Sequence, residues 1–152
     1  MSDKLFFKGC GVGNSVLPLL ESVNDIYIYA CDFSSTAIKL LQESSRYQSD
    51  RVTSFVCDAS KEEIPLENSS IDYCILIFVL SAMSVDQIKT TISRIYKVLK
   101  PGGKLCIRDY AIGDLAQLRF EEVIPDKDPN KLDENFYVRG DGTRAYYFTT
   151  GL

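Results

Sequence analysis

The chain has 152 residues, of which 45% are hydrophobic and 25% charged, and this is the composition of a globular protein long enough for one domain with a sizeable core. Its net charge of −4 argues against free-standing, non-specific nucleic-acid binding, although a local basic patch remains compatible with it. The chain contains no histidine, which excludes Ser-His-Asp and Cys-His catalysis and removes the commonest zinc ligand.

Five short apolar runs, rich in β-branched and aromatic residues, alternate with helix-like segments. Their hydrophobicity is continuous rather than alternating, which is typical of strands covered on both faces, as in a parallel sheet. We expect strands at residues 4–8, 26–31, 52–57, 71–80 and 104–109.

Helices are expected between these strands. Ser34 can cap a helix that carries apolar residues at 37, 38, 40 and 41. An apolar stripe at residues 85, 88, 92, 95 and 99 predicts an amphipathic helix, which Pro101-Gly102-Gly103 would end. The alternation predicts an α/β fold with a doubly wound, Rossmann-like, mostly parallel sheet.

A glycine-rich turn follows the first predicted strand, with glycines at Gly9, Gly11 and Gly13. Such a turn between a strand and a helix lets the backbone approach a ligand closely. Asp32 ends the second strand at about the 20-residue spacing of a ribose-binding carboxylate, and Asp58 follows the third strand.

The spacing of the glycines separates the candidate cofactors. The dinucleotide fingerprint G-x-G-x-x-G is not met, because Asn14 stands where the third glycine would be. S-adenosylmethionine has no phosphates and needs only a tight turn, so a methyl donor fits better than NAD. A structural turn without a ligand is the plain alternative.

The five cysteines form no C-x-x-C pair and lie singly in or beside apolar runs. We interpret them as small buried side chains of a reducing compartment rather than disulfide partners or metal ligands. No signal peptide or membrane-length apolar run is visible, so we expect a cytoplasmic protein, with the nucleus as the alternative, and no membrane or metal partner.

Longer motifs carry a resemblance to a known family. LKPGG at 99–103 resembles the post-helix turn of class I S-adenosylmethionine-dependent methyltransferases. The branch that contains the tRNA 3-methylcytidine (N3-cytidine) methyltransferases is similar in YACDFS at 29–34, IFVLSA at 77–82, RDY at 108–110, DLAQLRF at 114–120 and ENFYVRGDGTR at 134–144.

The resemblance implies specific roles in binding S-adenosyl-L-methionine. Gly9, Gly11 and Gly13 would line the methionine side of the cofactor, and Asp32 would bind the ribose hydroxyls. Three residues would contact the adenine: Asp58, Ala59 and Ile77. The implied activity is methylation of tRNA cytidine at N3 in the anticodon loop, with an aminoacyl-tRNA synthetase or another accessory protein as a candidate partner.

The implied chemistry asks little of side chains. Cytosine N3 keeps a lone pair at neutral pH, so positioning and desolvation should dominate catalysis. Asp109, at the end of the fifth strand, is the candidate to stabilise developing positive charge, or else it pairs with Arg108 or caps a loop. Arg139 and Arg144 are candidates to hold phosphates or a base, or else they flank a solvated hairpin with Asp141-Gly142 at its tip.

The chain departs from the family pattern in three places. Phe7 stands where the family usually carries an acidic residue, the N-terminal segment is only eight residues long, and the last strands of the sheet are expected to be missing. We therefore expect a single methyltransferase domain over residues 1–152, incomplete at both ends, with the fifth strand as an uncovered edge.

A non-catalytic cofactor-binding fragment or interaction module is the alternative function. Two further alternatives have less support from the sequence: methylation of a small molecule or a protein, and a nicotinamide-dependent oxidoreductase.

Overall fold

The computed structural model describes residues 2–123 and 130–149. The chain divides into two compact units, the first built from Met1–Ile77 and Asp86–Ile107, the second from Phe78–Val85 and Arg108–Leu152. The expectation of one domain over residues 1–152 stays a prediction.

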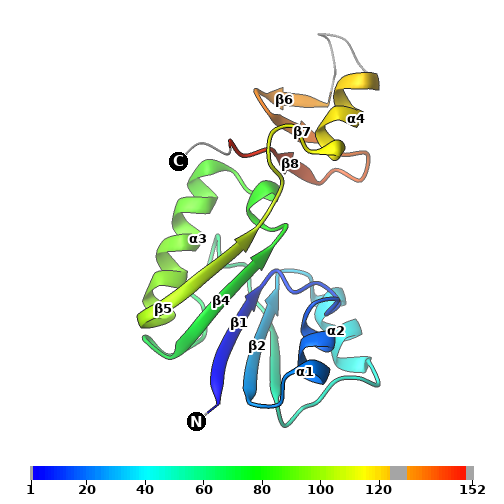
Figure 1. Ribbon diagram of the computed structural model, residues 1–152. Coiled ribbons are helices and arrows are strands. Elements are labelled where there is room, and N and C mark those ends of the chain that lie inside the picture. The colour runs from blue at the N-terminus through cyan, green and yellow to red at the C-terminus, as the bar shows by residue number, and fades with distance from the viewer. Residues whose placement is uncertain (1, 124–129, 150–152) are drawn as a thin grey trace. The chain divides into compact units, whose positions relative to one another are not determined.

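A five-stranded sheet forms the centre of the first unit (Figure 1). Its strands are β1 (Asp3–Lys8), β2 (Ile26–Asp32), β3 (Val52–Val56), β4 (Ile71–Ile77) and β5 (Leu99–Arg108), in the order β3-β2-β1-β4-β5. The central strand β1 pairs in parallel with β2 and β4, and β2 pairs in parallel with β3. The expected doubly wound, mostly parallel α/β fold is therefore confirmed, with β5 at one edge.

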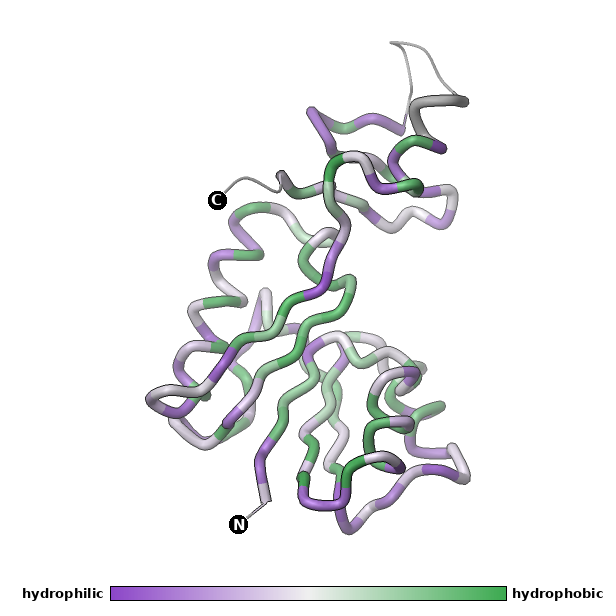
Figure 2. Tube along the Cα trace, viewed as in Figure 1, coloured by the Kyte–Doolittle hydropathy of each residue, from purple (hydrophilic) through white to green (hydrophobic). Residues whose placement is uncertain are grey.

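Helices cover both faces of this sheet. α1 (Val16–Ser22) and α2 (Ser35–Glu43) lie on one face and α3 (Val85–Val98) on the other (Figure 1). Buried side chains of α1 and α2, including Val16, Leu20 and Leu41, pack against β1, β2 and β3. Hydrophobic residues run along most of the length of the inner strands, as expected for strands covered on both faces (Figure 2).

The predicted caps and turns agree with the structure in part. Ser34 caps α2, because its side chain accepts a hydrogen bond of 3.2 Å from the Ala37 N–H, but Leu40, one of the apolar residues expected on this helix, is 51% exposed. In α3 the fully buried residues are Thr91, Ile95 and Val98, so the predicted stripe was shifted.

Two predicted strand ends were wrong. β4 ends at Ile77 and not at residue 80, because Phe78 has a φ of 56° and a short 3-10 helix, Leu80–Ala82, follows. A bulky residue in the left-handed region interrupts an extended strand. β5 begins at Leu99 and includes the Pro-Gly-Gly segment, which had been expected to form the turn before it.

The second unit contains helix α4 (Leu115–Val123) and a three-stranded antiparallel sheet, β6 (Lys131–Asp133), β7 (Phe136–Val138) and β8 (Arg144–Tyr146). Its small core includes Tyr137, Ala145 and Tyr147. β7 and β8 form the hairpin predicted around Asp141-Gly142, with Gly142 at a φ of 80°. Within the described residues, none of the helices is long and apolar enough to span a membrane.

Candidate functional site

The glycine loop connects the end of β1 to α1 and is tied to β2. The N–H groups of Gly9 and Cys10 both donate to the Cys31 carbonyl, at 2.8 and 3.0 Å. All three glycines of the loop have positive φ. This conformation keeps the loop backbone close to the end of β2.

Gly11 and Gly13 serve different physical purposes. A Cβ on Gly13 would lie 2.5 Å from Leu41 Cδ1 and 3.2 Å from Leu17 Cγ, so this glycine allows the loop to pack against the helices. A Cβ on Gly11 would meet nothing within 4 Å. The open side of the loop, where a ligand has room to approach, is therefore at Gly11.

Asp32 closes the loop against the end of β2. The residue is 8% exposed, and its Oδ2 accepts from the Gly11 N–H and its Oδ1 from the Ser34 N–H, each at 2.9 Å. Each carboxylate oxygen can accept a further hydrogen bond. Asp32 can thus hold the glycine loop and still accept from a ribose hydroxyl.

Asp58 and Ala59 lie directly beyond β3. Burial raises the pKa of the Asp58 carboxyl, but hydrogen bonds from Ser60 and the nearby Lys61 ammonium outweigh this, and its pKa is lowered overall. The carboxylate accepts from the Ser60 hydroxyl at 2.6 Å and lies 3.1 Å from Lys61 Nζ. Ala59 is fully buried, and its carbonyl accepts from Arg94 at 2.8 Å.

The strand register brings the predicted cofactor residues to one edge of the sheet. Lys8, the residue before Gly9, pairs with Cys31, the residue before Asp32, and with Leu76, the residue before Ile77. Asp32 in turn pairs with Val56, two residues before Asp58. Because β1 lies between β2 and β4, this edge is the topological switch point, where doubly wound sheets bind ligands.

The three other predicted residues lie in the second unit. Asp109 accepts from the Ser81 N–H at 3.0 Å and from the Tyr110 N–H at 2.9 Å, so its carboxylate caps a loop, as the plainer alternative anticipated. Its predicted catalytic role is not tested by these contacts.

The two arginines of the second unit stack on aromatic rings. The guanidinium carbon of Arg139 lies 5.1 Å from the Tyr110 ring centre, and that of Arg144 lies 6.0 Å from the Phe136 ring. These are cation–π distances.

Sequence reasoning missed an arginine–aromatic cluster around Phe78. Its ring is 43% exposed, lies 4.7 Å from the Tyr110 ring, and has the Arg108 guanidinium carbon at 5.5 Å. A positive φ at a phenylalanine is rare, and strained residues concentrate at functional sites. No local sequence pattern predicts the positive φ of Phe78.

Sequence reasoning also missed Lys8, which is only 3% exposed. A lysine after an apolar run normally indicates the exposed end of a strand, so its burial could not be expected.

The cysteines are free thiols, of which Cys31, Cys57 and Cys74 are buried as expected, whereas Cys106 is exposed. A hydrogen bond between Cys31 and Cys57 raises the pKa of the first and lowers that of the second, and burial raises the pKa of Cys10 to about 12. The described residues contain no group of three or more acidic, cysteine or histidine side chains suited to a metal ion.

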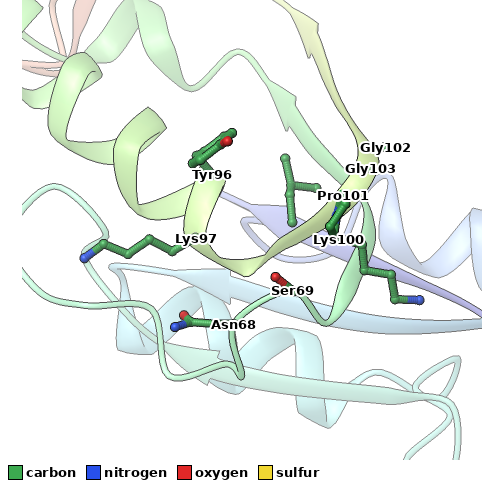
Figure 3. Close-up of a pocket in the computed structure, with 9 residues that line it drawn as sticks. Asn68, Ser69, Tyr96, Lys97, Lys100, Pro101, Gly102 and Gly103 are labelled. Atoms are coloured by element: carbon green, nitrogen blue, oxygen red, sulfur yellow. The ribbon is translucent and has the colours of Figure 1, made fainter.

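A hollow of about 420 Å³ lies at the end of the sheet opposite the switch point (Figure 3). It is lined by Tyr96, by the end of α3 and by the start of β5, and it includes none of the predicted site residues. Its two cations are already paired, Lys97 with Glu63 at 3.1 Å and Lys100 with Asp72 at 2.6 Å. We therefore assign the candidate site to the switch point and not to this hollow.

A glycine loop, a carboxylate at the end of β2 and a second carboxylate after β3 form the arrangement that doubly wound α/β folds use to bind nucleotides. Residues 8–103 match the family model described as "Methyltransferase domain". The chain belongs to this methyltransferase family.

Named relatives are longer than this chain. The tRNA N(3)-cytidine methyltransferase METTL2 of Bos taurus is 50% identical over 93% of this chain and 37% of its own length. Human tRNA N(3)-cytidine methyltransferase METTL6 is 47% identical over 93% of this chain and 48% of its own. O-methyltransferase 3 of Dictyostelium discoideum is 46% identical over 93% of this chain and 32% of its own. The chain thus spans less than half the length of these relatives.

Solved structures agree on the fold. A SAM-dependent methyltransferase of Methanosarcina mazei superposes with a TM-score of 0.77 and 22% identity, covering 97% of this chain and 74% of its own. Phosphoethanolamine N-methyltransferase 2 of Haemonchus contortus, in complex with S-adenosyl-L-methionine, has a TM-score of 0.63 and 27% identity over 81% of this chain and 28% of its own. The fold is that of S-adenosylmethionine-dependent methyltransferases.

Proposed function

We propose that the chain binds S-adenosyl-L-methionine at the switch-point edge and belongs to an enzyme that methylates tRNA cytidine at N3. One observation carries the cofactor proposal: the register of β1, β2, β3 and β4 gathers the glycine loop, Asp32, Asp58 and Ile77 at a single edge. The similarity to tRNA N(3)-cytidine methyltransferases over 93% of the chain supports the choice of substrate.

The residues present fit the cofactor. Gly11 leaves open space beside the loop, and Asp32 retains acceptor capacity for the ribose. Ile77 is half-buried against the core and offers an apolar surface for the adenine. When the cofactor binds, the Asp58 carboxylate would give up its contact with the exposed Lys61 and accept a hydrogen bond from the adenine amine instead.

The cofactor supplies an electrophilic methyl group on a sulfonium. The nucleophile is a neutral ring nitrogen with a free lone pair, so this chain's residues have to position both reactants and exclude water rather than remove a proton. We propose Asp109 as the carboxylate that stabilises the cationic product, with Asp109→Asn as the test: methylation should fall while cofactor affinity is kept.

For tRNA, the proposal relies on the arginine–aromatic cluster of the second unit. Single-stranded nucleic acid is recognised by stacking on aromatic rings and by arginine contacts to phosphates and bases. Phe78, Tyr110, Arg108 and Arg139 provide both kinds of group within one cluster. Arg144 is a further candidate because it is exposed beside Phe136.

The cofactor proposal is tested by calorimetric titration with S-adenosylhomocysteine. Asp32→Ala should weaken binding by about 1.5–3 kcal/mol, the usual contribution of hydrogen bonds to a charged group. Asp25→Ala is the matched control, since this residue directly precedes β2 and so lies at the other end of the strand from Asp32. Equal affinity of the wild type and Asp32→Ala would show that Asp32 is not part of the site. The unfolding of each variant is measured alongside, so that a loss of binding can be distinguished from a loss of the fold.

The competing function is a non-catalytic cofactor-binding or interaction module of the same family. Binding of S-adenosylhomocysteine without methylation of tRNA, with and without an accessory protein such as an aminoacyl-tRNA synthetase, would favour it.

We also propose a cytoplasmic location, supported by the free state of the described cysteines and testable by fractionation of cells that express the tagged chain.

A further inference from the structure

Lys8 is a mostly buried lysine at the carboxyl end of the central strand. It is the last residue of β1 and is 3% exposed. Its pairing with Cys31 and Leu76 places its side chain on the face opposite Phe7, which packs in the core beneath α1 and α2. Lys8 therefore lies at the switch point, on the face that α3 covers.

The charge of Lys8 acts on four thiols. Burial raises the pKa of Cys10 and Cys74, and the hydrogen bond with Cys57 raises that of Cys31, while the charge of Lys8 opposes each of these shifts. The hydrogen bond from Cys31 lowers the pKa of Cys57, and the charge of Lys8 acts in the same direction.

Among the residues that the structure describes, none of the ion pairs or hydrogen bonds involves the Lys8 side chain, and the Lys8 ammonium is not one of their buried unpartnered atoms, so it reaches solvent. Lysine commonly buries its alkyl chain and keeps its ammonium in contact with water, so the charge of Lys8 lies where its side chain meets solvent.

Three of these thiols lie next to residues of the candidate cofactor site. Cys10 stands between Gly9 and Gly11, Cys31 precedes Asp32, and Cys57 precedes Asp58. The charge of Lys8, the residue before Gly9, therefore acts on residues next to the glycine loop and the two carboxylates of the candidate cofactor site.

We propose that Lys8 sets the charge preference of this site, disfavouring the cationic sulfonium of S-adenosylmethionine relative to the neutral thioether of S-adenosylhomocysteine. This inference rests on the proposed cofactor site. The two ligands share their adenine, ribose and amino-acid groups and differ in one methyl group and one positive charge. The ratio of their dissociation constants therefore reports the local electrostatic potential at the sulfur.

The expected effect follows from Coulomb's law. Two positive charges about 8–12 Å apart, at an effective dielectric constant of about 20, change a ratio of dissociation constants by about 10- to 30-fold. Lowering the salt concentration should increase this ratio, because screening of partly solvated charges is reduced.

The test is calorimetric titration of S-adenosylmethionine and S-adenosylhomocysteine into the wild type, Lys8→Met and Lys8→Gln. Both variants remove the charge, so both should lower the ratio Kd(S-adenosylmethionine)/Kd(S-adenosylhomocysteine) about tenfold or more. Lys4→Met is the matched control, because it removes a lysine about 13 Å away along the same strand and should leave the ratio unchanged.

Each outcome has a distinct meaning. Binding of both ligands with the same ratio in the wild type and both Lys8 variants would overturn the role of Lys8 and leave the proposed cofactor site standing. Binding of neither ligand by any folded variant would overturn the cofactor site and this inference with it. Binding of S-adenosylmethionine only after Lys8 is replaced would be the strongest support.

Discussion

Gly11 and Gly13 lie two residues apart in the same loop, yet replacing each by alanine should produce opposite defects. At Gly13, where φ is 91°, an added Cβ would be 2.5 Å from Leu41 Cδ1, and Leu41 is fully buried and has little room to move. The unfavourable backbone conformation costs about 1–2 kcal/mol and overpacking of a core costs about 1–3 kcal/mol. We expect Gly13→Ala to destabilise the fold by about 2–5 kcal/mol, or roughly 2–4 °C in Tm for each kcal/mol.

At Gly11 the φ of 53° lies within the left-handed region that other residues can adopt, and an added Cβ meets nothing within 4 Å. The expected destabilisation by Gly11→Ala is about 1 kcal/mol. The methyl group would instead occupy the open side of the loop, so affinity for S-adenosylhomocysteine should fall while the fold is kept.

Thermal and urea unfolding, together with calorimetric titration, check this pair of variants. Equal losses of stability in the two variants would contradict this prediction, because Leu41 and Leu17 lie close to the Cβ position of Gly13 and more than 4 Å from that of Gly11. Unchanged affinity in Gly11→Ala would show that the open side of the loop is not where the ligand lies.

The remaining predictions concern the second unit and the response to pH. Arg144→Ala should leave the affinity for S-adenosylhomocysteine intact and reduce tRNA methylation; loss of cofactor binding would indicate that Arg144 supports the fold instead. Asp72 should make stability fall in acid: hydrogen bonds from the Lys100 ammonium and the Lys4 N–H lower its pKa below the ordinary 3.8. Its contribution is therefore complete above that value and is lost as the pH falls through the lower pKa of the folded state. Melting temperatures between pH 7 and about pH 2 should drop less for Asp72→Asn than for the wild type, and parallel curves over this range would contradict the prediction.

The location of the candidate site could be predicted because its residues are placed by strand ends. Parallel strands that alternate with helices bring their carboxyl ends to one edge, so a glycine loop after one strand and acidic residues after the next two must lie near each other. The departures came where backbone geometry changed direction: Phe78 ends β4 early, and β5 starts before the predicted turn.

The alternation of strands and helices, the glycine loop and the carboxylates at Asp32 and Asp58 can be predicted from the sequence, because these features depend on spacing along the chain. Only the tertiary contacts show which glycine packs against Leu41, that Asp32 holds the loop through Gly11, and that the Lys8 residue is mostly buried at the end of β1. Such contacts join residues that are distant in sequence, and local propensity contains no information about which distant side chains will become neighbours.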